Sequence, residues 1–294
     1  MNNRGMFVSY SSYVNILYFI GVMVINMFFM HPVILFISFV SSLTYSLYLN
    51  GMKSLKFDLF VLFPLLLFII LVNPLVNHQG TTILFYINNQ MITKESILYG
   101  IFAGMMIINM FLYFSSFNKI MTGDKIMSVL KFVSRKLSLI FVMTLRFVPR
   151  YKNEFNKIKV SQQCLNEGLN DGNFFDRIRH GSNVMSSLVT FALEDGIDTA
   201  DTMIARGYGL KNKSNYKREK FTSDDKVFFT LMIILFLIVT IGIIRGQFYI
   251  NFFPDFIFTE LSIHNALYFV SYFIFAMVPM IIEIKEALVW NLSK

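Results

Sequence analysis

The chain has 294 residues, of which 55% are hydrophobic, 17% aromatic and only 15% charged. Soluble domains carry about 25% charged residues, so this composition and a mean hydropathy of +0.57 exclude an ordinary water-soluble protein. The net charge of +8 gives little support to a nucleic-acid-binding protein, because basic residues beside membrane spans account for such an excess.

Charged residues are missing from five long stretches of the sequence, namely 5–52, 59–76, 96–118, 227–244 and 261–282. A helix needs about 20 apolar residues to cross about 30 Å of hydrocarbon. Transmembrane strands are excluded because their hydrophobicity alternates instead of running continuously. The sequence therefore predicts an all-α polytopic protein of the cell membrane.

The first of these stretches is long enough for two crossings. Met30-His31-Pro32 lies near its middle, and a residue before proline is disfavoured in helical geometry. The first apolar run is also longer than the about 7–15 residues of a signal peptide, so we expect no cleaved leader. We predict six transmembrane helices, near 12–30, 33–49, 57–76, 96–117, 227–244 and 265–284.

Basic residues are concentrated between the fourth and fifth predicted spans, where residues 119–226 hold 19 of the 26 Lys and Arg. Basic flanks mark the cytoplasmic side of a membrane protein, so this topology places both termini inside the cell and leaves only Lys94 and Arg245 outside. We predict three parts: 1–118 with spans one to four, 119–226 as a cytoplasmic and interfacial region, and 227–294 with spans five and six and the C-terminal tail.

Helical periodicity begins early in the cytoplasmic region. Apolar residues at 126, 129, 130 and 133, with basic residues between them, predict an amphipathic helix at the membrane surface. The apolar stretch 137–149 is too short to cross and is expected to pack against the base of the bundle. A more polar helix is predicted over 151–165, before a glycine turn.

A further helix is predicted over 174–206, with candidate breaks near Gly181 and Gly196. Gly207 follows at the position where helices commonly end in left-handed geometry. Two amphipathic helices of this kind could dock into grooves on a soluble partner. The alternative is that they only cover the cytoplasmic surface.

Motifs of catalysis and of cofactor binding are absent from the sequence. It contains no GxxxxGK[ST], HExxH, GxSxG or paired CxxC motif, which argues against a P-loop ATPase and common metal or serine hydrolases. The single Cys164 and four scattered histidines offer no metal set, so we expect no metal and no cofactor. The spans are nearly free of charge, which disfavours a secondary transporter or proton pump.

Several stretches match a known family in order and spacing. They are NPLVNHQGTTILF (73–85), MITKES (91–96), TGDKIMSVL (122–130), TLRFVPRYKNEFNKIKVSQQ (144–163) and TADTMIARGYG (199–209). With them the chain resembles the transmembrane T component of energy-coupling factor (ECF) importers, a family that includes the cobalt-uptake permease subunit. The similarity covers roughly residues 55–285, and 73–96 is similar to the family's outer loop after its third span.

The resemblance implies two coupling helices, each docking on an ABC-type ATPase through a short Arg motif. The second motif is intact as Ala205-Arg206-Gly207, whereas the first reads Asn166-Glu167-Gly168. An acid replaces the base, which implies either a partner with a changed groove or one weakly docking arm. Arg146 and Pro149 are expected to shape the elbow that leads from the membrane base into the first coupling helix.

The implied function is non-catalytic: ATP hydrolysis would reside in one or two partner ATPases. The chain would relay their movement, within the lipid bilayer, to a small membrane S component that binds a vitamin or a metal ion. A conventional ABC permease, a self-contained transporter and a lipid-modifying membrane enzyme are the alternatives. For Arg206, the alternative is a favourable interaction with the helix dipole of about 0.3–1 kcal/mol, and for Glu167 it is a solvated surface acid.

Overall fold

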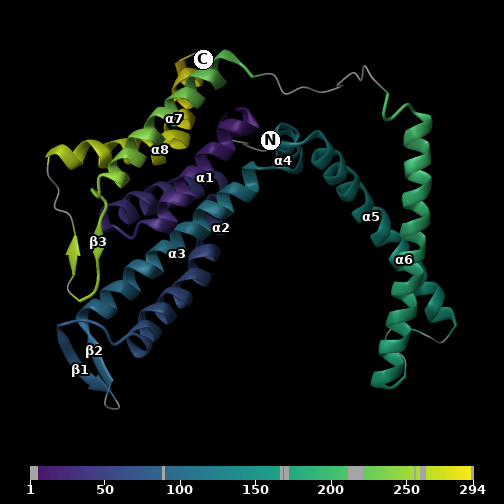
Figure 1. Ribbon diagram of the computed structural model, residues 1–294, viewed down its shortest axis with the longest axis horizontal. Coiled ribbons are helices and arrows are strands. Elements are labelled where there is room, and N and C mark those ends of the chain that lie inside the picture. The colour runs from purple at the N-terminus through teal and green to yellow at the C-terminus, as the bar shows by residue number, and fades with distance from the viewer. Residues whose placement is uncertain are drawn as a thin grey trace. The chain divides into compact units, whose positions relative to one another are not determined.

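Helices make up most of the computed structural model, which describes residues 6–87, 90–165, 168, 172–210, 221–254, 256–258 and 263–292 (Figure 1). The chain divides into two units. The membrane unit joins Met1–Ile126 with Lys220–Lys294, and the arm unit comprises Met127–Glu219.

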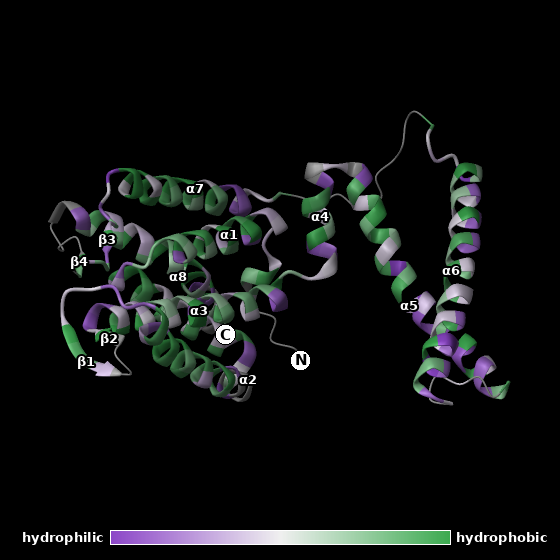
Figure 2. Cartoon of the chain, turned by 60° about the horizontal axis from the view of Figure 1, so that its bottom comes forward, coloured by the Kyte–Doolittle hydropathy of each residue, from purple (hydrophilic) through white to green (hydrophobic). Residues whose placement is uncertain are grey.

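The membrane unit consists of long helices and two short hairpins. In chain order its elements are η1 (Met6–Ser9), α1 (Ser12–Phe28), α2 (Pro32–Val76), β1 (Ile83–Ile87), β2 (Gln90–Thr93), α3 (Lys94–Ile120), α7 (Ser223–Ile244), β3 (Ile250–Asn251), β4 (Ile257–Phe258) and α8 (Ile263–Leu292). Apolar residues cover its helices over most of their length (Figure 2). The predicted all-α polytopic membrane fold is confirmed.

Five helical segments among the described residues are long and apolar enough to cross a membrane: Pro32–Met52, Asp58–Val76, Lys94–Ile120, Ser223–Ile244 and Asn265–Val289. They correspond to the second to sixth predicted spans. The first corresponds to α1, which has 17 residues and therefore stands at the lower limit of about 17 residues for a crossing helix.

The break predicted at Met30-His31-Pro32 is present, because α1 ends at Phe28 and α2 begins at Pro32. The His31 side chain accepts a hydrogen bond from the Val33 amide at the start of α2. Helix α2 holds two spans and changes direction at Gly51, where φ is 75° and ψ is 169°. Glycine adopts such a positive φ without the steric cost that other residues incur.

Buried polar side chains connect the helices of the membrane unit. Asn109 on α3 donates hydrogen bonds to the side-chain oxygen of Asn26 on α1 (3.3 Å) and to the Leu35 carbonyl on α2 (3.0 Å). The Tyr18 hydroxyl on α1 donates to the Ala276 carbonyl on α8 (2.8 Å). Such hydrogen bonds favour helix association in a membrane, and they connect α1, α2, α3 and α8.

The stretch after α2 leads into the hairpin of β1 and β2, which pair antiparallel. The Thr93 hydroxyl donates a hydrogen bond to the Gln79 carbonyl (2.7 Å). Gly80 has a φ of +136°, and a Cβ at this position would lie 2.5 Å from a carboxylate oxygen of Glu95. The hydrogen bond thus connects the loop to the residue that precedes α3. The close packing around Gly80 leaves no space for a side chain there.

The arm unit is formed by the end of α4 (Gly123–Val133) and by α5 (Arg135–Cys164) and α6 (Phe174–Ala205). Helix α4 appears where an amphipathic helix was predicted. The stretches 137–149 and 151–165, predicted as separate helices, are one continuous helix. Pro149 lacks an amide proton and leaves the Leu145 carbonyl without its helical donor, but the helix continues through both residues.

The breaks predicted near Gly181 and Gly196 are absent, because α6 runs without interruption from Phe174 to Ala205. An isolated glycine costs a helix only about 1 kcal/mol relative to alanine. A helix of this length, packed against α5, tolerates that cost at two positions.

Candidate functional site

The end of α6 carries the intact Arg motif in a defined capping geometry. Gly207 has a φ of +81°, as predicted for a left-handed helix end. The Gly207 amide donates to the Ile204 carbonyl (2.9 Å) and the Tyr208 amide to the Met203 carbonyl (2.9 Å). These two bonds are those of a Schellman motif, so the backbone on both sides of Arg206 is held in place.

Arg206 is exposed at this helix end. No hydrogen bond or ion pair of its guanidinium exists within the described part of the chain. The neighbouring Ala205 is small and exposed, and Gly207 has no side chain at all. The guanidinium can therefore reach a surface that approaches the helix end closely.

The end of α5 carries the altered motif. Helix α5 ends at Cys164, and the Leu165 amide donates to the Gln162 carbonyl (3.1 Å) in the final turn. Asn166 and Glu167 lie outside the described residues, and Gly168 is buried. Exposed apolar surface remains at Leu165.

Arg146 and Pro149 lie in the interior of α5 and are both exposed. We expected an elbow at these two residues. The helix continues on both sides of them, so no helix ends there. Their proposed architectural role stays a prediction.

Helices α5 and α6 contact each other where an ion pair connects them. A guanidinium nitrogen of Arg150 lies 2.7 Å from a carboxylate oxygen of Asp195, whose side chain is only 5% exposed against 53% for that of Arg150. The guanidinium also lies 5.8 Å from the ring centre of Phe191, and Tyr151 meets the same ring edge to face (6.1 Å). Helices α5 and α6 contact each other and cross in the view of Figure 1.

The sequence interpretation did not single out this ion pair. The sequence does contain one indication of it, the helical spacing of residues. Asp195 continues the spacing of Val184, Leu188 and Phe191, which are buried or half-buried in the structure. An acidic residue on an otherwise apolar helix face requires a partner when it is buried. Which basic residue supplies it could not be derived from α6 alone.

A second face of α6 leaves apolar side chains exposed, at Met185, Val189, Leu193, Ile197 and Ile204. Figure 2 shows hydrophobic and hydrophilic residues interspersed along α6. Contiguous exposed apolar surface is typical of a protein or membrane interaction site. The arm unit thus combines an exposed cation at a helix end with an apolar surface on the same helix.

Comparison with known proteins places the chain in a family. The sequence model of the CbiQ family, described as cobalt transport protein, matches residues 9–216. This match extends over the first membrane helices and over the arm unit as far as residue 216.

Several proteins that bear the same name are similar to this chain at low sequence identity. The energy-coupling factor transporter transmembrane protein EcfT of Thermotoga maritima is 25% identical over 74% of this chain and 78% of its own length. The EcfT of Streptococcus thermophilus is 24% identical over 70% of this chain and 79% of its own length. The EcfT of Lactobacillus helveticus is 28% identical over 39% of this chain and 43% of its own length. The chain belongs to the CbiQ family and is a transmembrane T component of the ECF transporter type.

Proposed function

We propose that this chain transmits movement from two partner ABC-type ATPases to a small substrate-binding membrane protein, the S component. The observation that carries the proposal is the cationic end of α6. Arg206 is exposed there on a capped helix terminus, and its guanidinium has no partner within the described residues.

The chemistry of Ala205-Arg206-Gly207 suits docking on an acidic groove. A guanidinium can form two parallel hydrogen bonds with one carboxylate. The small residues beside it allow the partner surface to approach the backbone. The Schellman bonds hold this segment in position before the partner arrives, which lowers the entropic cost of association.

The end of α5 would dock more weakly. Its motif contains Glu167 in place of arginine, and like charges placed together at an interface reduce affinity. We therefore propose asymmetric docking, in which Ala205-Arg206-Gly207 provides the stronger contact and Asn166-Glu167-Gly168 meets either a different groove or a looser one.

The contact between the helices would let movement at one docking end reach the other helix. Beyond the Arg150–Asp195 pair, α5 continues for about 20 Å to Cys164 and α6 for about 15 Å to Ala205. The ion pair and the ring contacts of Phe191 resist sliding of one helix along the other. The S component would select the substrate, a vitamin or a metal ion, and ATP hydrolysis would take place in the partner ATPases.

Charge reversal at Arg206 tests the proposal. In Arg206→Glu, we expect about tenfold or greater loss of ATPases that co-purify with the tagged chain in mild detergent, because removing a paired interface charge costs several kcal/mol. Mass spectrometry quantifies the retained proteins. Membrane insertion and the size-exclusion profile should not change.

Lys152→Glu is the matched control, since Lys152 is exposed in the interior of α5, away from both helix ends. It makes the same change in net charge and should retain the ATPases. Normal ATPase recovery and normal uptake in Arg206→Glu would contradict the docking role.

A further inference from the structure

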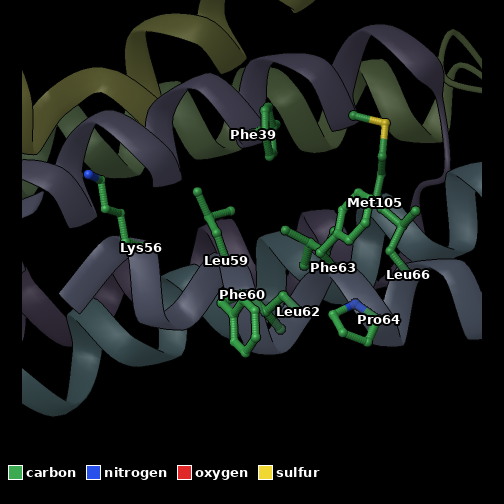
Figure 3. A pocket seen from close by; sticks show the side chains of 10 residues that line it. Phe39, Lys56, Leu59, Phe60, Leu62, Phe63, Pro64, Leu66 and Met105 are labelled. Carbon is green, nitrogen blue, oxygen red and sulfur yellow. The ribbon is translucent and has the colours of Figure 1, made fainter. Parts of the chain in front are cut away.

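A cavity of about 690 Å³ lies between the two spans of α2 and helix α3. Figure 3 shows side chains from these helices around it. Among its lining residues, Leu62 and Ile108 are buried, whereas Phe60 and Phe63 are exposed. The cavity is therefore a groove that opens on the surface of the membrane unit.

The groove is apolar except at one end. Nine of its ten lining residues are apolar, and the tenth is Lys56. Lys56 lies on α2 between the spans Pro32–Met52 and Asp58–Val76, so we expect it near the membrane surface. Its ammonium nitrogen is at one extreme of the groove in Figure 3.

The length of the groove matches one leaflet of a bilayer. On the part of α2 after Gly51, its lining extends from Lys56 to Leu66, which is about 15 Å at 1.5 Å per residue. This is half of the about 30 Å of hydrocarbon in a membrane. A transmembrane helix of another protein would extend over the full thickness, so the groove fits an occupant of one leaflet better.

The cation at the end of the groove is available to a ligand. No ion pair joins Lys56 to a carboxylate in the described part of the chain. The acid nearest in sequence is Asp58, which instead accepts a hydrogen bond from the Ser115 hydroxyl on α3 (3.3 Å). A phosphate at the membrane surface would supply the missing anion.

We propose that this groove binds one anionic phospholipid of the leaflet on the Lys56 side. An acyl chain lies against the groove walls formed by Phe39, Leu59 and Met105, and the headgroup phosphate pairs with Lys56. Burial of the chain provides affinity in proportion to the apolar area covered. The ammonium selects anionic over zwitterionic headgroups, as basic residues near a membrane surface do.

Native mass spectrometry of the full chain, purified in mild detergent, measures this binding with phosphatidylglycerol and phosphatidylcholine as probes. We expect one retained phosphatidylglycerol, favoured over phosphatidylcholine by about fivefold, which corresponds to one surface lysine. Lys56→Gln should remove this preference. Met105→Trp, which fills the groove, should abolish retention of both lipids.

Lys285→Gln is the control, because Lys285 is an exposed cation on α8 that does not line the groove; it should keep the preference. Leu59→Trp repeats the groove-filling test from another helical segment, should Met105→Trp fail to give a monodisperse protein. Equal retention in wild type, Lys56→Gln and both tryptophan variants would overturn the proposal. So would cross-linking of a groove residue to a helix of another membrane protein in the intact complex, with no lipid retained.

Discussion

At the scale of single residues, Gly207 sets how α6 ends and where Arg206 stands. Its φ of +81° lies in the left-handed region, which costs residues with a Cβ about 1–2 kcal/mol. Gly196, in the interior of the same helix, presents the opposite case. A Cβ at this position would meet nothing within 4 Å, so glycine there only increases the conformational freedom of the unfolded chain.

The same substitution should therefore have opposite effects at these two positions. Gly207→Ala is expected to destabilise the end of α6 by about 1–2 kcal/mol, and Gly196→Ala to stabilise the helix by about 0.5–1 kcal/mol. Hydrogen exchange of the amides in the last two turns of α6 measures both effects. Faster exchange in both variants, or in neither, would contradict the expected opposite effects of the two substitutions.

At the scale of elements, one buried acidic residue connects α6 to α5 through an ion pair. Asp195 is almost fully buried and is paired with Arg150 at 2.7 Å. The other ion pair among the described residues of this unit, between Glu154 and Lys157, lies within a single turn of α5, and its lysine is 73% exposed. The first pair connects two helices, whereas the second can only support the helix that contains it.

We expect Asp195→Asn to lower the free energy of unfolding of the arm unit by about 1–3 kcal/mol, because a hydrogen bond to a charged group is lost from a buried site and Arg150 can still hydrate. Glu154→Gln should change it by less than about 0.5 kcal/mol. Thermal unfolding of the full chain in detergent, with hydrogen exchange around Phe191 and Tyr151, measures the difference. Equal effects of the two substitutions would show that the interhelical ion pair does not stabilise the contact between α5 and α6.

At the scale of the whole molecule, α1 decides on which side of the membrane the N-terminus lies. If its 17 residues cross the bilayer, the six crossings place both termini on the same side as the arm unit, as the distribution of basic residues predicts. If α1 does not cross, the N-terminus lies on the side opposite to the arm unit.

Accessibility labelling distinguishes the two topologies. Cys164 is exposed and is the single cysteine of the chain, so a membrane-impermeant maleimide should label it only after cells are permeabilised. Lys94→Cys in a Cys164→Ser background should react in intact cells. An N-terminal epitope tag should follow the behaviour of Cys164, and detection of this tag on intact cells would refute the six-span topology.

Local features of the sequence predicted much of this fold. Charge-free stretches predicted the five long spans, because hydrocarbon excludes charge over a fixed thickness. His31-Pro32 and Gly207 predicted a helix boundary and a left-handed cap, because the backbone restrictions of proline and glycine act within a few residues. The same local reasoning failed at Pro149, Gly181 and Gly196, where the helices continue.

The interhelical contacts depend on packing that no local pattern contains. Periodicity shows which face of α6 carries Asp195, but only the contact between α5 and α6 shows that Arg150 is its partner. The groove at Lys56 likewise requires three helical segments to be brought together. The sequence was sufficient for the membrane class and the long spans, since these follow from short-range chemistry. The ion pair and the groove arise from residues distant in the chain, whose proximity is fixed by how the helices pack.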